Sequence, residues 1–269
     1  MRTVLVLLTI AVATPVIGTV VIVAALLGVR DVPGGVFDLA PRVWGWLLCK
    51  AAGVRVVVHH EGEPPAGPCV YVANHVSWFD VFSIASVLKH YKFVAKAELE
   101  RIPIFGRAMR AAGFIFVDRQ NRKAAFEGYE KAAARIRDGV SVVVHPEGTR
   151  GDEYALRPFK KGPFVLAIAA GVPVVPTLVY GTREVQRRGS FRVSRGVVHL
   201  HFLPALATAG LDYAGRDQLS RETWARMAST LERTYGIVST TGGSSPAEPA
   251  VDTRPTATQV PGGAHLTTH

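Results

Sequence analysis

Cysteine is nearly absent from the chain of 269 residues, which has only Cys49 and Cys69. Two cysteines allow at most one disulfide and provide no cysteine-rich metal site. Both lie in apolar stretches, so we interpret them as buried free thiols. The sequence has no GxSxG motif, which argues against a serine lipase. It also shows no metal-ligand cluster, and we expect that no metal is required.

Charged residues are absent from Thr3 to Val29. This run exceeds the roughly 20 apolar residues that span a bilayer. The apolar region of a cleaved signal peptide is shorter, about 7 to 15 residues, so we favour a membrane anchor. Pro15 and Gly18 interrupt the run, and both a single span and a re-entrant helical hairpin remain open.

Acidic residues are fewer than basic residues, and the net charge is +10. Such an excess fits either anionic lipid or nucleic acid, because both present phosphates to basic side chains. The anchor favours lipid. We therefore expect a protein of the cell membrane, with a cytoplasmic catalytic domain and with basic residues such as Arg187 and Arg188 helping to seat it on lipid.

Three regions follow from composition. Residues 1–53 are predicted to be the membrane anchor followed by a helix from Pro41 to Gly53, which either lies at the interface or packs in the core. Residues 54–237 form the catalytic domain. Residues 238–269 are rich in Ser, Thr, Pro and Gly and are expected to be disordered.

Short β-branched runs alternate with helical patterns between Val54 and Ile237. This alternation predicts an α/β fold, layered, with a mostly parallel sheet flanked by helices. Ser220 is predicted to cap the last helix. Pro173 and Pro176 suggest an edge strand or a bulge.

Polar clusters follow three of the predicted strands. In the first, ANHVSWFD, His75 and Asp80 are five positions apart and cannot share one helical face. They can meet if His75 lies in a loop and Asp80 in the first helical turn, with Ser77 as the N-cap. Asp80 would then fix the tautomer of a histidine base. A capping box between Ser77 and Asp80 explains the same residues, and both interpretations can hold together.

The other clusters are GFIFVDR, which ends in Arg119, and HPEGTR, which ends in Arg150. Ligands bind at the carboxyl ends of strands in open α/β sheets, and arginine forms paired hydrogen bonds with phosphate. Gly148 allows the backbone to approach a ligand, and Thr149 supplies a hydroxyl. Each cluster alone also fits a solvated arginine or a plain turn.

Together with VPVVPTLVYG, these segments resemble, in order, the signature of the glycerolipid acyltransferase family, over about Val54 to Leu206. The resemblance implies a catalytic base with its orienting carboxylate and a set of substrate-binding residues. The implied catalytic residues are His75 and Asp80, and the implied binding residues are Lys96, Gly113, Arg119, Glu147, Gly148, Thr149, Arg150 and Pro176. The family usually has Phe where this chain has His145, which we interpret as a structural histidine.

The implied reaction transfers a fatty acyl group from an acyl thioester to the free hydroxyl of 1-acylglycerol-3-phosphate, which gives phosphatidic acid. The thioester, acyl-CoA or acyl carrier protein, is a co-substrate, and no other cofactor is expected. Partners are membrane phospholipid and the lysolipid. Another lysolipid, a lyso-aminolipid or glycerol-3-phosphate remains an alternative acceptor. A membrane-tethered protein that binds phospholipid or nucleic acid without catalysis is the alternative outside enzymes.

Overall fold

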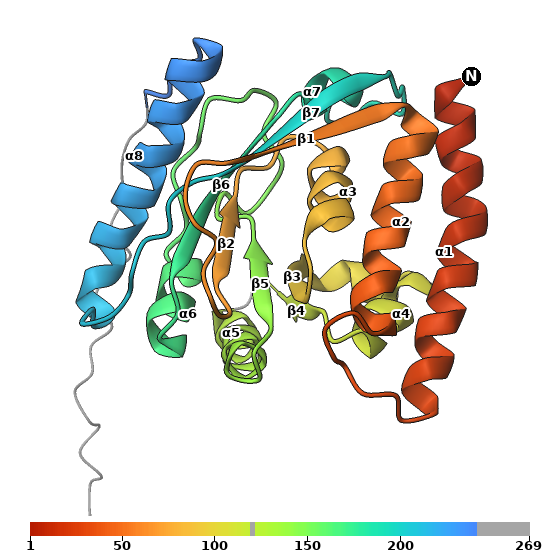
Figure 1. The fold of residues 1–269 in the computed structure, drawn as a ribbon, viewed down its shortest axis with the longest axis horizontal. Coiled ribbons are helices and arrows are strands. Elements are labelled where there is room, and N and C mark those ends of the chain that lie inside the picture. Colours follow the sequence, from red (N-terminus) through yellow and green to blue (C-terminus); the bar gives the residue numbers. More distant parts are fainter. Residues whose placement is uncertain (119–121, 241–269) are drawn as a thin grey trace, which may run out of the picture.

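The chain forms one seven-stranded sheet with helices on both faces (Figure 1). The structure is a computed structural model that describes residues 1–118 and 122–240. The strand order is β1-β7-β6-β2-β5-β3-β4. The strands are β1 Val54–His60, β2 Val70–Ala73, β3 Tyr91–Lys96, β4 Ile115–Val117, β5 Ser141–Val144, β6 Val174–Tyr180 and β7 Gly196–Phe202.

The sheet is mostly parallel, as predicted, and β6 with β7 is the antiparallel pair. Two helices precede the sheet, and the others connect or follow its strands (Figure 1). The α-helices are α1 Arg2–Leu26, α2 Val36–Ala52, α3 Trp78–Val87, α4 Phe105–Ala111, α5 Arg122–Arg137, α6 Gly162–Ala170, α7 Thr182–Val185 and α8 Arg216–Tyr235. Two short 3₁₀ helices, η1 Ala97–Arg101 and η2 Tyr213–Gly215, complete the set.

Two predicted helix starts are wrong. Helix α8 begins at Arg216, so Ser220 lies inside the helix and does not cap it. The cap of this region is Asp212, whose carboxylate accepts hydrogen bonds from Ala214 N and Gly215 N. Helix α2 begins at Val36, earlier in the chain than the predicted start at Pro41. Its first turn holds Asp38, and a carboxylate near a helix N-terminus is favourable.

Each face of the sheet has its own apolar core, because successive strand residues point to opposite faces. Val70 and Val72 of β2 join the cluster that contains Ile136 of α5, Phe164 of α6 and Met227 of α8. The opposite face packs against α2 and α3, with Leu48, Phe79, Ile84, Val143 and Val175 among its buried residues. Cys49 and Cys69 are buried free thiols in this second cluster, as predicted.

Pro176 is not on an edge strand, because β6 lies between β2 and β7. Antiparallel pairing with β7 begins one residue later, at Thr177 opposite Phe202. The Pro176 carbonyl accepts a hydrogen bond from Leu203 N at 3.0 Å, just beyond the end of β7. The position therefore tolerates proline inside the sheet, since the missing N–H falls where the regular ladder has ended.

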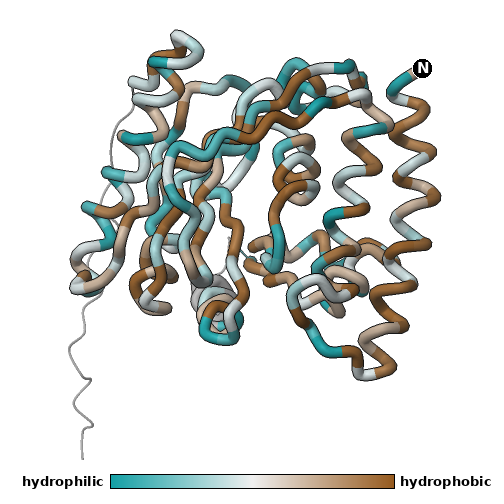
Figure 2. Tube along the Cα trace, in the orientation of Figure 1, coloured by the Kyte–Doolittle hydropathy of each residue, from teal (hydrophilic) through white to brown (hydrophobic). Residues whose placement is uncertain are grey.

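Helix α1 is continuous through Pro15, so the single-helix form of the predicted anchor is the one observed. Among the described residues it is the one helix long and apolar enough to cross a membrane. Figure 2 shows it as a column of brown segments with pale segments between them, along one flank of the molecule. Only 22% of its most apolar window is buried inside the protein, so most of this surface is left for another apolar environment.

Helix α2 packs between α1 and α3. Of the two predicted places for this segment, the membrane interface and the protein core, the structure shows the core. Leu48 and Cys49 are buried, whereas Trp46 on the same helix is 51% exposed. Gly45 faces α3 so closely that a Cβ at this position would lie 2.6 Å from the carbonyl oxygen of Phe82. Only glycine permits this distance, and α2 and α3 are therefore in backbone contact.

A cluster of histidines joins strands β1 and β7 to helix α8. His59 Nε2 lies 2.9 Å from His199 Nδ1. His201 is held between the Glu61 carboxylate at 2.8 Å and the Tyr235 hydroxyl at 2.7 Å. Burial and the neighbouring histidines lower the pKa of His199 below its usual value of 6.5. Burial also lowers the pKa of His201, although Glu61 opposes this.

These two shifts predict a loss of stability in mild acid. The unfolded chain binds protons at His199 and His201 more readily than the folded chain, so stability falls as pH drops below the unfolded pKa of about 6.5. We expect the Tm in neutral detergent to fall between about pH 7.5 and about pH 5.5, by about 2 to 4 °C for each kcal/mol lost. His201→Gln should reduce this fall, whereas the exposed His60→Gln should retain all of it. An equal acid response of wild type and His201→Gln would contradict the assignment.

Candidate active site

A histidine–aspartate pair lies at the carboxyl end of β2, where the chain turns into α3. His75 is in the loop and Asp80 is the third residue of the helix, and His75 Nδ1 lies 2.8 Å from Asp80 Oδ2. Ser77 caps the helix and forms a capping box with Asp80, so both interpretations of this segment hold. The carboxylate accepts from Nδ1–H, which leaves Nε2 with the lone pair that a general base needs.

Asp80 is fully buried and surrounded by donors. Its Oδ2 also accepts hydrogen bonds from Val76 N at 2.7 Å and Ser77 N at 2.8 Å. Its Oδ1 accepts one from the Thr182 hydroxyl at 2.5 Å. Thr182 is fully buried and follows β6, so the end of a second strand holds the carboxylate. Four donors fix both oxygens of Asp80, and the carboxylate in turn fixes the plane of His75.

His145, at the end of β5, lies flat against His75. The ring centroids are 4.1 Å apart and the rings are inclined by 15°. Its Nδ1 donates to the carbonyl oxygens of Ala73 at 3.0 Å and Asn74 at 3.2 Å. Those backbone contacts support our interpretation of His145 as a structural residue, which here packs against the His75 ring as another aromatic side chain would.

The segment after His145 braces the loop that carries His75. Glu147 Oε1 accepts from His75 N at 3.1 Å, and Glu147 Oε2 accepts from Arg157 Nε at 2.8 Å. Arg157 also donates to the side chain and the carbonyl of Thr149. Burial raises the pKa of Glu147, and the Arg157 guanidinium opposes that rise. Glu147 is therefore a buried link between the loop after β2, which carries His75, and the loop after β5.

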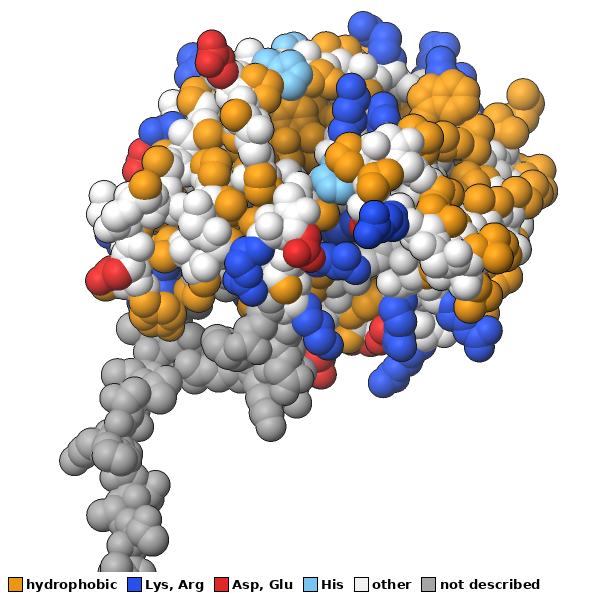
Figure 3. Space-filling view, turned by 60° about the horizontal axis from the view of Figure 1, so that its bottom comes forward, with side chains coloured by type: hydrophobic (Ala, Val, Ile, Leu, Met, Phe, Trp, Pro, Cys, Tyr) orange, Lys and Arg blue, Asp and Glu red, His pale blue; other side chains and the backbone are white. Residues whose placement is uncertain are grey.

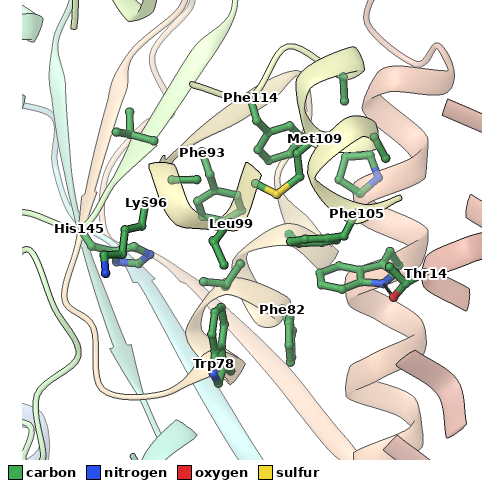
Figure 4. A pocket seen from close by; sticks show the side chains of 18 of the residues that line it. Thr14, Trp78, Phe82, Phe93, Lys96, Leu99, Phe105, Met109, Phe114 and His145 are labelled. Carbon is green, nitrogen blue, oxygen red and sulfur yellow. Dashed lines mark hydrogen bonds between the residues drawn. The ribbon is translucent and has the colours of Figure 1, made fainter. Parts of the chain in front are cut away.

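A large apolar cavity of about 540 Å³ opens beside His75, a volume typical of pockets for small ligands. Figure 4 shows His145 and Lys96 at one end and Phe105 and Thr14 at the other. Aromatic and aliphatic side chains form the walls between these ends, among them Phe82, Phe93, Leu99, Met109 and Phe114. The far wall belongs to the N-terminal helices: Thr14, Ile17, Gly18 and Val21 come from α1, and Trp44 comes from α2.

Basic side chains gather where the cavity meets the surface. Arg150 lies over the ring of Trp78, with its guanidinium carbon 4.8 Å from the ring centroid. Lys96, which also lines the cavity, is paired with Glu98 at 2.7 Å. Arg188 is the third basic residue of the lining. The cavity thus combines an apolar interior with a cationic mouth that contains His75.

The residues implied by the resemblance separate into two groups. His75, Lys96, Gly148, Thr149 and Arg150 line the cavity, and Asp80 and Glu147 lie directly behind them. Two others stand apart from the lining: Pro176 is inside the sheet, and Gly113 forms the tight turn before β4 with φ of +79°. Arg119 lies outside the described residues, and its role stays a prediction.

Sequence reasoning missed several residues that shape this site. Thr182, Arg157 and Trp78 contact Asp80, Glu147 and Arg150, respectively. Trp78 was within a quoted motif, and a large aromatic residue at the first helical position was its available signal. Thr182 and Arg157 have no local signal, because long-range folding brings them to the site. The anchor helix was expected only to hold the protein, yet it also forms a wall of the cavity.

Comparison with known proteins shows what this domain is similar to. Residues 55–180 match the family model described as Acyltransferase. A chloroplastic 1-acyl-sn-glycerol-3-phosphate acyltransferase of Brassica napus is 38% identical over 123 residues, which are 46% of this chain and 36% of that protein. The alpha 1-acyl-sn-glycerol-3-phosphate acyltransferase of Ovis aries is 37% identical over 164 residues, which are 59% and 56% of the two chains. The chain thus spans less than two thirds of either relative.

A solved structure agrees with the fold. The crystal structure of PlsC, the 1-acyl-sn-glycerophosphate acyltransferase of Thermotoga maritima, superposes with a TM-score of 0.68 and 24% identity. The match covers 84% of this chain and 96% of that one, so the likeness of fold includes more than the matched domain. Residues 55–180 are thus similar in sequence to the Acyltransferase family, and the chain shares its fold with the Thermotoga maritima structure.

Proposed function

We propose that the protein transfers a fatty acyl group from an acyl thioester to the free hydroxyl of 1-acylglycerol-3-phosphate and so forms phosphatidic acid. The observation that carries the proposal is the placement of the His75–Asp80 pair between an apolar cavity and a cationic mouth. The apolar part suits an acyl chain, the mouth suits a phosphate, and the base lies where the two substrates would meet.

The chemistry requires one proton to be moved from the acceptor oxygen to the leaving sulfur, and it requires no enzyme nucleophile. His75 Nε2 takes the proton of the acceptor hydroxyl while that oxygen attacks the thioester carbonyl. The thiol then leaves, and His75 returns the proton to its sulfur. Asp80 stabilises the imidazolium between these steps. The thioester is already activated, so the reaction needs neither a metal nor a cofactor beyond the co-substrate thioester.

Helix α1 gives the reaction access to the membrane. Its outward side chains include Leu5, Leu8, Val12 and Val16, all more than half exposed. In Figure 3, hydrophobic side chains cover the α1 flank, and Lys and Arg side chains outnumber acidic ones on the face beside it. An apolar flank bordered by basic residues fits a protein inserted in a membrane with anionic headgroups. Lysolipid then reaches the cavity from the bilayer.

The test is acyl transfer by the detergent-solubilised protein from a labelled acyl thioester, with acyl-CoA and acyl carrier protein thioesters as separate donors. The acceptors are lysophosphatidate, glycerol-3-phosphate and lysophosphatidylcholine. Labelled phosphatidic acid, formed only when lysophosphatidate is present, is the expected product. Activity confined to another acceptor would refute the proposed substrate, and a folded protein without activity towards any pair would refute the proposed reaction class.

The position of Thr14 predicts an effect on acyl-chain length. Thr14 lies at the far end of the cavity, where its hydroxyl accepts a hydrogen bond from Trp44 Nε1 at 3.0 Å. Thr14→Phe should fill that end, and a chain that loses the burial of two methylenes loses about 1.6 kcal/mol, or about 15-fold in kcat/KM. We expect this loss with long acyl donors and little change with short ones.

Thr14→Val is the matched control, because it removes the hydrogen bond and keeps the size. It should retain the wild-type preference for chain length. An equal fall of kcat/KM with donors of all lengths in Thr14→Phe would show that the acyl chain does not reach this wall.

A further inference from the structure

Two arginines, Arg150 and Arg188, line the same mouth of the cavity. Arg150 stacks on Trp78, and among the described residues neither a carboxylate nor a carbonyl accepts a hydrogen bond from its guanidinium. Arg188 lines the same mouth and reaches it from the loop after α7. Its Nη1 is tied to Asp152 Oδ2 at 3.1 Å, which occupies one edge of its guanidinium.

The two guanidinium groups are close enough to affect each other. Burial lowers the pKa of Arg150, and the like charge of Arg188 lowers it further. Two cations that face one opening repel each other, and an anion placed between them would relieve that repulsion. Trp78 and Asp152 hold the two groups in place without neutralising Arg150, so the pair is already organised for an anion.

We propose that Arg188, together with Arg150, forms the binding site for the phosphomonoester of the acceptor lipid and selects it over phosphodiester lysolipids. This inference rests on the proposed function and assigns a residue outside all the sequence motifs of the family. A phosphomonoester carries close to two negative charges at neutral pH, and two guanidinium groups match it through charge-assisted hydrogen bonds. Lysophosphatidylcholine has one negative charge, and its quaternary ammonium would face two cations.

Arg187 is a natural control for Arg188. It is the neighbouring residue, it is exposed, and it does not line the cavity. Arg187→Met and Arg188→Met remove the same charge from the same loop. Attraction to anionic lipid would be weakened equally in both variants, and assays in neutral detergent micelles minimise that contribution. The side chain of Arg188 is 46% exposed, so its replacement should not disturb folding.

The experiment measures KM for lysophosphatidate and kcat/KM for lysophosphatidate, lysophosphatidylcholine and monoacylglycerol in the two variants and in Arg188→Lys. We expect Arg188→Met to raise KM for lysophosphatidate at least tenfold more than Arg187→Met does, and to leave the rate with monoacylglycerol unchanged. Arg188→Lys should restore part of the affinity. Equal KM values in Arg188→Met and Arg187→Met, or a parallel loss with monoacylglycerol, would overturn the assignment.

Direct binding separates this inference from the proposed reaction. If the wild type transfers no acyl group to lysophosphatidate, the proposed function fails, and the equilibrium Kd for short-chain lysophosphatidate still tests the arginine pair. A Kd at least tenfold weaker in Arg188→Met than in Arg187→Met would support the site without catalysis. Equal Kd values would overturn it.

Discussion

Replacement of His75 by alanine is expected to lower kcat for acyl transfer about 10²- to 10⁴-fold, the range that a positioned general base contributes. The structure predicts that the fold survives this change. The backbone N–H of His75 contacts Glu147, and its carbonyl accepts from Gly151 N at 2.7 Å. Alanine keeps both contacts and loses only the imidazole. The measurement is kcat with saturating acyl thioester and lysophosphatidate, together with the Tm of each variant.

His75→Asn sharpens this test, because asparagine can still donate to Asp80 but cannot act as a base. It should be as inactive as His75→Ala, whereas the exposed His60→Ala should retain full activity. Acyl transfer near the wild-type rate in a folded His75→Ala protein would rule out His75 as the base.

Replacement of Asp80 by asparagine should lower kcat about 10²- to 10³-fold, equivalent to about 3 to 4 kcal/mol in the transition state. The backbone donors Val76 N and Ser77 N require an acceptor at the Oδ2 position, so the amide oxygen should take that place. The amide nitrogen then faces the Thr182 hydroxyl, which can rotate to accept from it. His75 keeps its tautomer, and the loss reports the missing charge beside the imidazolium.

Thr182→Val is the graded comparison, because it removes one donor from Asp80 and leaves the His75 contact in place. We expect it to lower kcat by about tenfold or less, with some loss of stability from the unpaired oxygen of a buried carboxylate. A kcat of Asp80→Asn equal to that of wild type would limit Asp80 to its capping role.

The sequence predicted the layered α/β fold because each strand and helix has a local pattern, and it predicted the contact of His75 with Asp80 because a capping signal fixed the start of α3. Prediction failed where the cause is not local. The central place of β6 depends on strand order, which no proline reveals. The start of α8 was missed because Asp212 caps a separate 3₁₀ turn first.

The same distinction applies to the site. Motifs at the strand ends predicted that His75, Asp80 and Arg150 would come together, since these residues are close in sequence to the strands that place them. The contacts made by Thr182, Arg157 and Arg188 depend on the loop conformations after β5 and β6. The apolar wall from α1 was also missed, because an apolar run that suits a bilayer gives no sign that one side of it lines a cavity.

The backbone contact at Gly45 has a consequence for how the protein would sit relative to a bilayer. Helix α3 carries Asp80, which contacts His75. The backbone contact of α3 with α2 therefore links His75 to α2, which also packs against α1. With α1 inserted in a bilayer, this packing would fix the distance between His75 and the hydrocarbon layer. A lysolipid would then have to bring its free hydroxyl to that level before it could react.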